Sequence, residues 1–282
     1  MFRHILVPLD GSVQAERALP VAARLARASA GMIVLIRIIE HTLGDEQEAS
    51  SESSLFPAMV RSERREAQQY LAGIATSHQL AGCPVIVSVQ SGPVLAAIQI
   101  VIATYHIDLL VCCEQQDLQH SSHFLSSFAK KLSSHLAVPL LLLPAHEPRS
   151  GSLIEQKYPL TCVVAFMGVQ PEHFLISPAT ALLAGLANRK PAHLHFVPLR
   201  SVFNGKATEQ PAVPFSQERV ASRSGAAFLK EPGQLRKTEQ EGEQRRGDMF
   251  VLALPRPGDS SDLFWKMDAY PRLLIPTQRR EQ

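Results

Sequence analysis

The side chains in this sequence that are best suited to catalysis or ligand binding lie between positions 108 and 144. Thiol, imidazole and hydroxyl side chains gather there: Cys112, Cys113, His120, His123, Ser121, Ser122, Ser126 and Ser127. An apolar run precedes this polar segment, and an amphipathic pattern and a second apolar run follow it. The segment therefore has the layout of a loop that leaves a strand and enters a helix, where open α/β sheets usually hold phosphate. The position favours an anion site, but the residue types are not those of a tight phosphate cradle.

Metal binding and nucleophilic catalysis are the other chemistries that these residue types suggest. Adjacent strand residues point to opposite faces, so Cys112 and Cys113 cannot both ligate one ion, and we predict no metal site. The serines fit helix capping better than anion binding. Asp10 and Ser12 lack a nucleophile elbow and a partnered histidine, so we predict no catalytic residues. Capping of the first helix and a ligand role both stay open for this pair.

Composition excludes several classes of function. The chain has 282 residues and a net charge of +2, which gives no electrostatic case for nucleic acid. No apolar run approaches 18 residues, so no membrane span is expected. The four cysteines show neither disulfide nor zinc spacing, and the first residues lack a signal-peptide pattern. These features predict a cytoplasmic protein.

The first half alternates apolar runs with helical patterns. Strands are expected at residues 4–9, 32–39, 84–89, 109–113 and 138–143. Helices are expected at residues 13–29, 58–79 and 94–105, and a fourth carries the stripe Phe124, Phe128, Leu132 and Leu136. Continuous apolar strands separated by helices are typical of a parallel sheet covered on both faces.

The second half repeats this pattern in shortened form. A strand, a helix and a strand are expected at residues 162–166, 174–188 and 193–199, whereas residues 203–247 are polar and receive no assignment. Residues 247–252 repeat the layout of 107–112, and residues 269–276 repeat 137–144. The connection between these two segments is eight residues shorter in the second half. The repeat predicts domains at 1–146 and 160–282, joined by a linker at 147–159.

The motif at residues 5–12 (ILVPLDGS), followed by AERALP at 15–20, resembles the opening of the universal stress protein family. Ser91-Gly92-Pro93 and the DLLV at 108–111 match further positions of that family, and the resemblance covers residues 1–146. Residues 160–282 look like a worn second copy, as in tandem members. The resemblance implies two tandem, open, parallel five-stranded sheets with helices on both faces, of the Rossmann-like adenine-nucleotide-binding α/β type.

Nucleotide-binding members of the family carry Gly-x-x-Gly-x9-Gly-Ser/Thr after the fourth strand. An ungapped match places Cys113, Gln116, Ser126 and Ser127 at those four positions, so all three glycines are missing. Glycine permits positive φ and lets phosphate approach backbone amides. Asp10 matches the family's acidic residue, and Ile38 matches the apolar residue beside the adenine. These six residues form a vestigial nucleotide site in which the nucleoside half persists and the phosphate loop is degraded.

The second half retains fewer of the nucleotide-site residues than the first, since Met167 occupies the position of Asp10. We therefore expect no nucleotide site in residues 151–282.

The sequence thus favours a stress-response or regulatory protein without enzymatic activity or cofactor, acting through ligand sensing or protein contacts. The alternative is an adenine-nucleotide binder that takes ATP or AMP with Mg²⁺ in its first domain, with at most slow hydrolysis. By the resemblance, the two halves form an intramolecular pseudo-dimer with their fifth strands at the mutual edge. A homodimer and a separate protein partner stay open.

Overall fold

The computed structural model describes residues 2–40, 56–114, 137–144, 160–166, 173–187, 192–198, 249–253 and 271–276. The predicted helix around Phe124 and the unassigned segment 203–247 lie outside these residues. All statements about the fold concern the described part of the chain.

The first half contributes five parallel strands in the order β3-β2-β1-β4-β5. They are β1 (His4–Pro8), β2 (Met32–Ile39), β3 (Val85–Ser91), β4 (Leu109–Cys113) and β5 (Leu140–Leu143). Their apolar residues pack on both faces of the sheet. This burial explains the runs without polar alternation, because a strand covered on both faces needs apolar side chains at every position.

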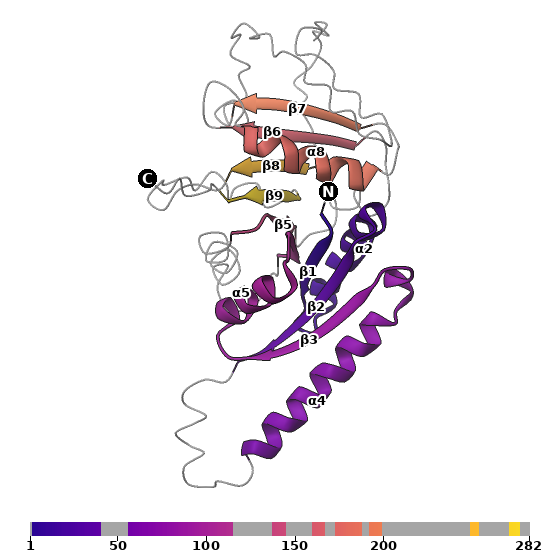
Figure 1. Ribbon diagram of the computed structural model, residues 1–282, viewed down its shortest axis with the longest axis vertical. Coiled ribbons are helices and arrows are strands. Elements are labelled where there is room, and N and C mark those ends of the chain that lie inside the picture. Colours follow the sequence, from indigo (N-terminus) through magenta and orange to yellow (C-terminus); the bar gives the residue numbers. More distant parts are fainter. Residues whose placement is uncertain are drawn as a thin grey trace, which may run out of the picture.

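The second half contributes β6 (Leu160–Phe166), β7 (Ala192–Pro198), β8 (Met249–Ala253) and β9 (Arg272–Ile275). These strands are parallel to one another, but β9 pairs with β5 in antiparallel orientation. The described strands therefore form one continuous nine-stranded sheet, in which the second half supplies four strands (Figure 1). The parallel α/β class is confirmed. The two expected sheets are joined because β5 and β9 satisfy each other's edge hydrogen bonds.

Helices cover both faces of the sheet. The helices are α1 (Val13–Glu16), α2 (Ala18–Ser29), α4 (Phe56–Ala75), α5 (Val94–Tyr105) and α8 (His173–Ala187), with a 3-10 turn at His78–Leu80. One face carries α2, α4 and α8, and the other carries α5. The expected helix at 13–29 is divided into α1 and α2 at Arg17. No helix in the described part of the chain combines the length and the apolar character needed to cross a membrane.

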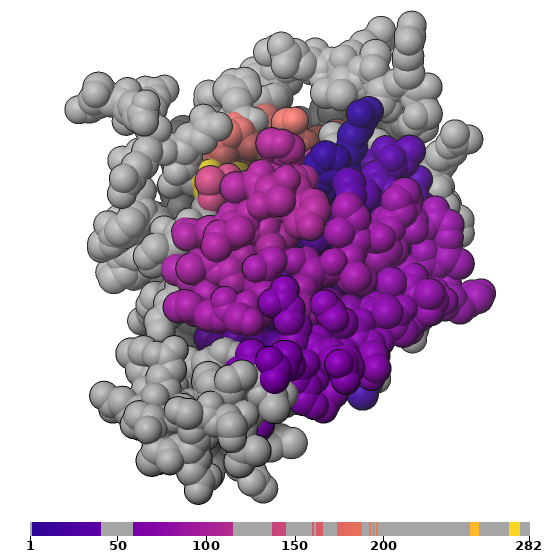
Figure 2. All heavy atoms as spheres, turned by 60° about the horizontal axis from the view of Figure 1, so that its bottom comes forward, coloured from indigo at the N-terminus to yellow at the C-terminus, as the bar shows by residue number. Residues whose placement is uncertain are grey.

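Helix packing also ties the halves together, besides the β5–β9 pairing. Helices α2 and α8 pack against each other, with Leu25 lying against Gly185. Figure 2 views the molecule from the end where α4 and β3 lie, and the residues between 56 and 114 form one continuous surface there. Strands and helices of the second half, in orange and yellow, show beyond the upper edge of that surface.

Asp108 fastens β4 to the beginning of β1. Its carboxylate accepts the backbone N–H of Arg3 at 2.8 Å and that of His4 at 3.0 Å. The N–H of Asp108 in turn donates to the carbonyl of His4 at 3.0 Å. This residue therefore fixes the relative position of the two strands that flank the candidate site.

Replacing Asp108 by Asn is expected to lower the free energy of unfolding by about 1–3 kcal/mol. The substitution removes the charge and leaves one acceptor oxygen for two amide donors. Urea denaturation measures the change. The exposed Asp10, replaced by Asn, serves as the matched control and should change stability by less than about 0.5 kcal/mol. An equal loss in both variants would contradict the assigned role.

Candidate functional site

The carboxyl ends of β2, β1 and β4 lie side by side at one edge of the sheet. The chain leaves β1 toward β2 on one side, and β4 pairs with β1 on the other. This reversal of strand order is the place where open α/β sheets bind ligands. The described residues at this edge are 9–12 after β1, 37–40 at the end of β2, and Glu114 after β4.

Asp10 and Ser12 form a compact turn after β1. The Asp10 carboxylate accepts the N–H of Ser12 at 2.8 Å, and the Ser12 hydroxyl accepts the N–H of Ala15 at 3.1 Å. Ser12 is therefore the N-cap of α1, which confirms capping at this turn. Asp10 remains exposed, so its carboxylate is accessible to a ligand.

A cluster of Arg37, Tyr70 and Glu16 supports this turn. Gly11 has φ +89°, and a Cβ at this position would lie 2.6 Å from Nη1 of Arg37. The guanidinium lies 5.5 Å from the centroid of the Tyr70 ring, and the Tyr70 hydroxyl donates to Glu16 at 2.9 Å. Burial, and then the hydrogen bond to Glu16, raise the pKa of Tyr70, so the phenol remains a donor. Sequence reasoning missed this cluster, although Arg37 is the one charged residue in β2.

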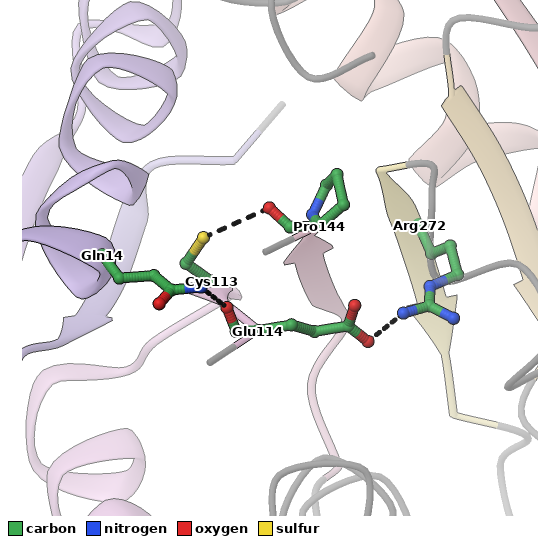
Figure 3. A network of polar contacts seen from close by, with 5 residues as sticks. All are labelled: Gln14, Cys113, Glu114, Pro144 and Arg272. Atoms are coloured by element: carbon green, nitrogen blue, oxygen red, sulfur yellow. Dashed lines mark hydrogen bonds and ion pairs between the residues drawn. The ribbon is translucent and has the colours of Figure 1, made fainter. Parts of the chain in front are cut away.

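Protein contacts occupy the backbone of Glu114, the first residue after β4. Its N–H donates to the carbonyl of Leu143 at 2.8 Å, and its carbonyl accepts Nε2 of Gln14 at 2.7 Å. Its carboxylate forms an ion pair with Arg272 from β9 (Figure 3). Glu114 therefore connects α1, β5 and the second half of the chain.

Arg272 lies inside the sheet at the joint between the halves. It faces Leu142 of β5 in the register of the antiparallel pair. Its side chain is 1% exposed, whereas that of Glu114 is 14% exposed. The internal repeat contains a signal for this residue that sequence reasoning did not use. When PRLLIP of the second half is aligned with PLLLLP of the first, Arg272 stands opposite Leu140, so a charged residue replaces an apolar one.

The two neighbouring thiols are held in their neutral form. Burial raises the pKa of Cys113 to about 11, with Arg17 acting against the shift and Glu114 adding to it. Burial is also the main cause that raises the pKa of Cys112. The Cys113 thiol donates to the carbonyl of Pro144 at 3.6 Å. Among the described residues, no three His, Cys, Asp or Glu side chains are placed to hold a metal ion.

Three of the six predicted site residues can be placed, and all three lie at the carboxyl edge. Asp10 follows β1, Ile38 is next to last in β2, and Cys113 ends β4. Ile38 packs toward α5, whereas Cys113 packs on the opposite face, with α2. Asp10 and Ile38 thus lie at the ends of two neighbouring strands, and Cys113 faces the core. Gln116, Ser126 and Ser127 lie outside the described residues.

The thiols should make the protein less stable in alkaline solution. Because the folded pKa of Cys113 is raised, the unfolded chain releases this proton first, and stability falls as the pH rises from about 8.5 toward 11. The expected slope is up to about 1.4 kcal/mol per pH unit for this thiol. Urea denaturation between pH 7 and pH 10.5 measures it. Cys113→Ser keeps a donor for Pro144 and should make the profile shallower, while Cys112 retains part of the slope. Parallel profiles would contradict the prediction.

The strand order and the helices on both faces define an open α/β protein whose strand order reverses between β1 and β4. A model of the universal stress protein family matches residues 1–144, which is half of the chain. The chain belongs to the universal stress protein family.

Solved structures resemble the chain over both halves. A universal stress protein from Archaeoglobus fulgidus DSM 4304 is 11% identical, with 97% of this chain and 98% of that chain covered, at a TM-score of 0.56. A protein of unknown function from Pseudomonas aeruginosa PAO1 is 12% identical, with 98% and 92% covered, at 0.51. A putative universal stress protein from Pseudomonas aeruginosa UCBPP-PA14 is 13% identical, with 98% and 93% covered, at 0.50. At these identities the likeness concerns the fold alone. A comparison with curated proteins finds no match.

Proposed function

We propose that this chain is a non-enzymatic stress-response or regulatory member of its family, which acts through protein contacts or ligand sensing and does not hold a nucleoside triphosphate. The observation that carries the proposal is the commitment of Glu114 to the protein itself. Its amide, its carbonyl and its carboxylate contact Leu143, Gln14 and Arg272 respectively.

A phosphate cradle at the end of a strand needs amide N–H groups that point at the ligand and a site free of negative charge. The N–H of Glu114 donates to the carbonyl of Leu143 in β5, and the Glu114 carboxylate brings a negative charge to this edge. Where the family's phosphate loop has a glycine, this chain has Cys113, whose buried and neutral thiol fills space that a phosphate would need. The residues at the exit of β4 therefore favour a closed structural joint over a triphosphate site.

Thermal unfolding with ATP, ADP or AMP at millimolar concentration, each with Mg²⁺, tests this proposal. A ligand at about 100 times its dissociation constant would stabilise the native state by about 2.7 kcal/mol. We expect no shift with ATP and no release of phosphate from it. A clear rise in the melting temperature with ATP would overturn the proposal.

Adenine-nucleotide binding through the nucleoside half is the second candidate, and the exposed carboxylate of Asp10 favours it. In this case AMP should stabilise the native protein even if the triphosphate does not. Asp10→Asn is the matched variant, because the amide oxygen can still accept the N–H of Ser12. Loss of the AMP shift in this variant would place the nucleoside at Asp10, and an unchanged shift would place it elsewhere.

We also propose that the halves act as an intramolecular pseudo-dimer in the cytoplasm, and the β5–β9 pairing supports this arrangement. A chain of this kind should be a monomer at micromolar concentration in sedimentation equilibrium. A dimer would point instead to association through another surface.

A further inference from the structure

Arg272 is a cation in a position where the sheet alone would favour an apolar residue. In the register of the sheet it lies between Leu142 of β5 and Phe250 of β8, and its side chain is 1% exposed. Removing a charged group from water costs several kcal/mol, and buried ion pairs are often no more stable than apolar side chains of similar volume. The repeat has Leu140 at the equivalent position. Fold stability therefore does not explain a guanidinium here.

The guanidinium is directed at the ligand edge of the first half. It reaches the carboxylate of Glu114, which lies 158 residues away in the sequence and directly follows β4 (Figure 3). The Glu114 side chain is 14% exposed, so its end of the pair is close to solvent while the cation is enclosed. The carboxylate is therefore the member of the pair that solvent can reach.

We propose that Arg272 forms an oxyanion-binding subsite at the carboxyl edge of the first half, and that the Glu114 carboxylate is its internal occupant. The planar guanidinium presents paired N–H donors whose spacing fits carboxylate and phosphate equally well. The ligand class is therefore phosphate, either free or as part of a nucleotide. The second half supplies the cation, and the first half supplies the group that fills the site.

The inference rests on the proposed function, since a filled subsite is a reason for the wild-type chain to reject a triphosphate. The proposed function and the Arg272 subsite are tested by different measurements. A wild-type melting shift with ATP counts against the proposed function, whereas the Glu114 variants below test the subsite itself.

The experiment removes the internal anion and supplies an external one. Glu114→Gln keeps the size of the side chain without its charge, and Glu114→Ala opens the space. The probe is inorganic phosphate, compared with chloride at equal ionic strength and constant pH. We expect phosphate to raise the melting temperature of either variant by about 3 °C at roughly ten times its dissociation constant, and to leave the wild type unchanged.

The double variant Glu114→Gln with Arg272→Met is the matched control, because it lacks both the occupant and the cation. It should show no phosphate-specific rise. The subsite is excluded if neither single variant responds to phosphate, or if the double variant responds equally. If Glu114→Ala does not fold, the phosphate response of Glu114→Gln alone tests the subsite. A larger rise with AMP than with phosphate in Glu114→Gln would assign the subsite to a nucleotide phosphate, and an equal rise would assign it to the free oxyanion.

Discussion

Replacing Glu114 by Ala is expected to lower the free energy of unfolding by about 3–5 kcal/mol, and by more than Arg272→Met does. Removing one member of a buried pair leaves the other charge buried without that partner, which is the main cost. The cation left by Glu114→Ala is enclosed in the sheet, with 1% of its side chain exposed. The carboxylate left by Arg272→Met starts 14% exposed and can turn toward water.

Urea denaturation in a chloride buffer without phosphate measures this asymmetry. The double variant Glu114→Gln with Arg272→Met removes both charges and should recover most of the loss, because neutral replacements avoid the cost of burying ions. A loss in Arg272→Met equal to or greater than that in Glu114→Ala would show that the enclosed guanidinium is not the costly partner.

Gly11→Ala should cost about 1–3 kcal/mol in the free energy of unfolding and should disturb the turn that presents Asp10. A non-glycine residue at φ +89° is strained by roughly 1–3 kcal/mol. The added Cβ would also lie 2.6 Å from Nη1 of Arg37, which is the far end of a flexible side chain and can move aside at a smaller further cost. The guanidinium would have to leave the Tyr70 ring to make room.

A double-mutant cycle separates these two causes. Arg37→Ala alone should cost about 1 kcal/mol, since it loses one cation–π contact. With Arg37 already removed, Gly11→Ala should cost only the backbone strain, so the two changes should be less than additive. Full additivity in urea denaturation would show that the guanidinium does not confine the turn.

The strands and helices with long apolar runs were predicted closely, because burial leaves a continuous or periodic signal in the sequence. The expected elements at 32–39, 94–105 and 109–113 coincide with β2, α5 and β4. The expected helix at 13–29 differs because Arg17 ends a one-turn helix capped by Ser12, and α2 begins anew at Ala18. Alanine spacing continues through this break, so periodicity alone could not locate it.

The candidate site was predicted less fully, because its decisive contacts join distant segments. Asp10 and Ile38 could be placed at the carboxyl edge from local motifs. The pairing of Glu114 with Arg272 could not, since no local pattern links residues 158 positions apart. The contact of Arg37 with Gly11 likewise depends on the alignment of β2 beside β1. A lone arginine within an apolar strand marks both cases and is a useful signal for such clusters.

The antiparallel pairing of β5 with β9 has a consequence for how this chain can assemble. It consumes the edge through which two separate copies could extend their sheets, and among the described strands it leaves β3 and β7 as the free ends. Because the pairing partners are covalently linked, each meets the other at an effective concentration in the millimolar range whatever the cellular amount of protein. The β5–β9 pairing, the packing of α2 against α8 and the Arg272–Glu114 ion pair together hold the second half against the first. The second half also contributes the Arg272 side chain to the carboxyl edge of the first half.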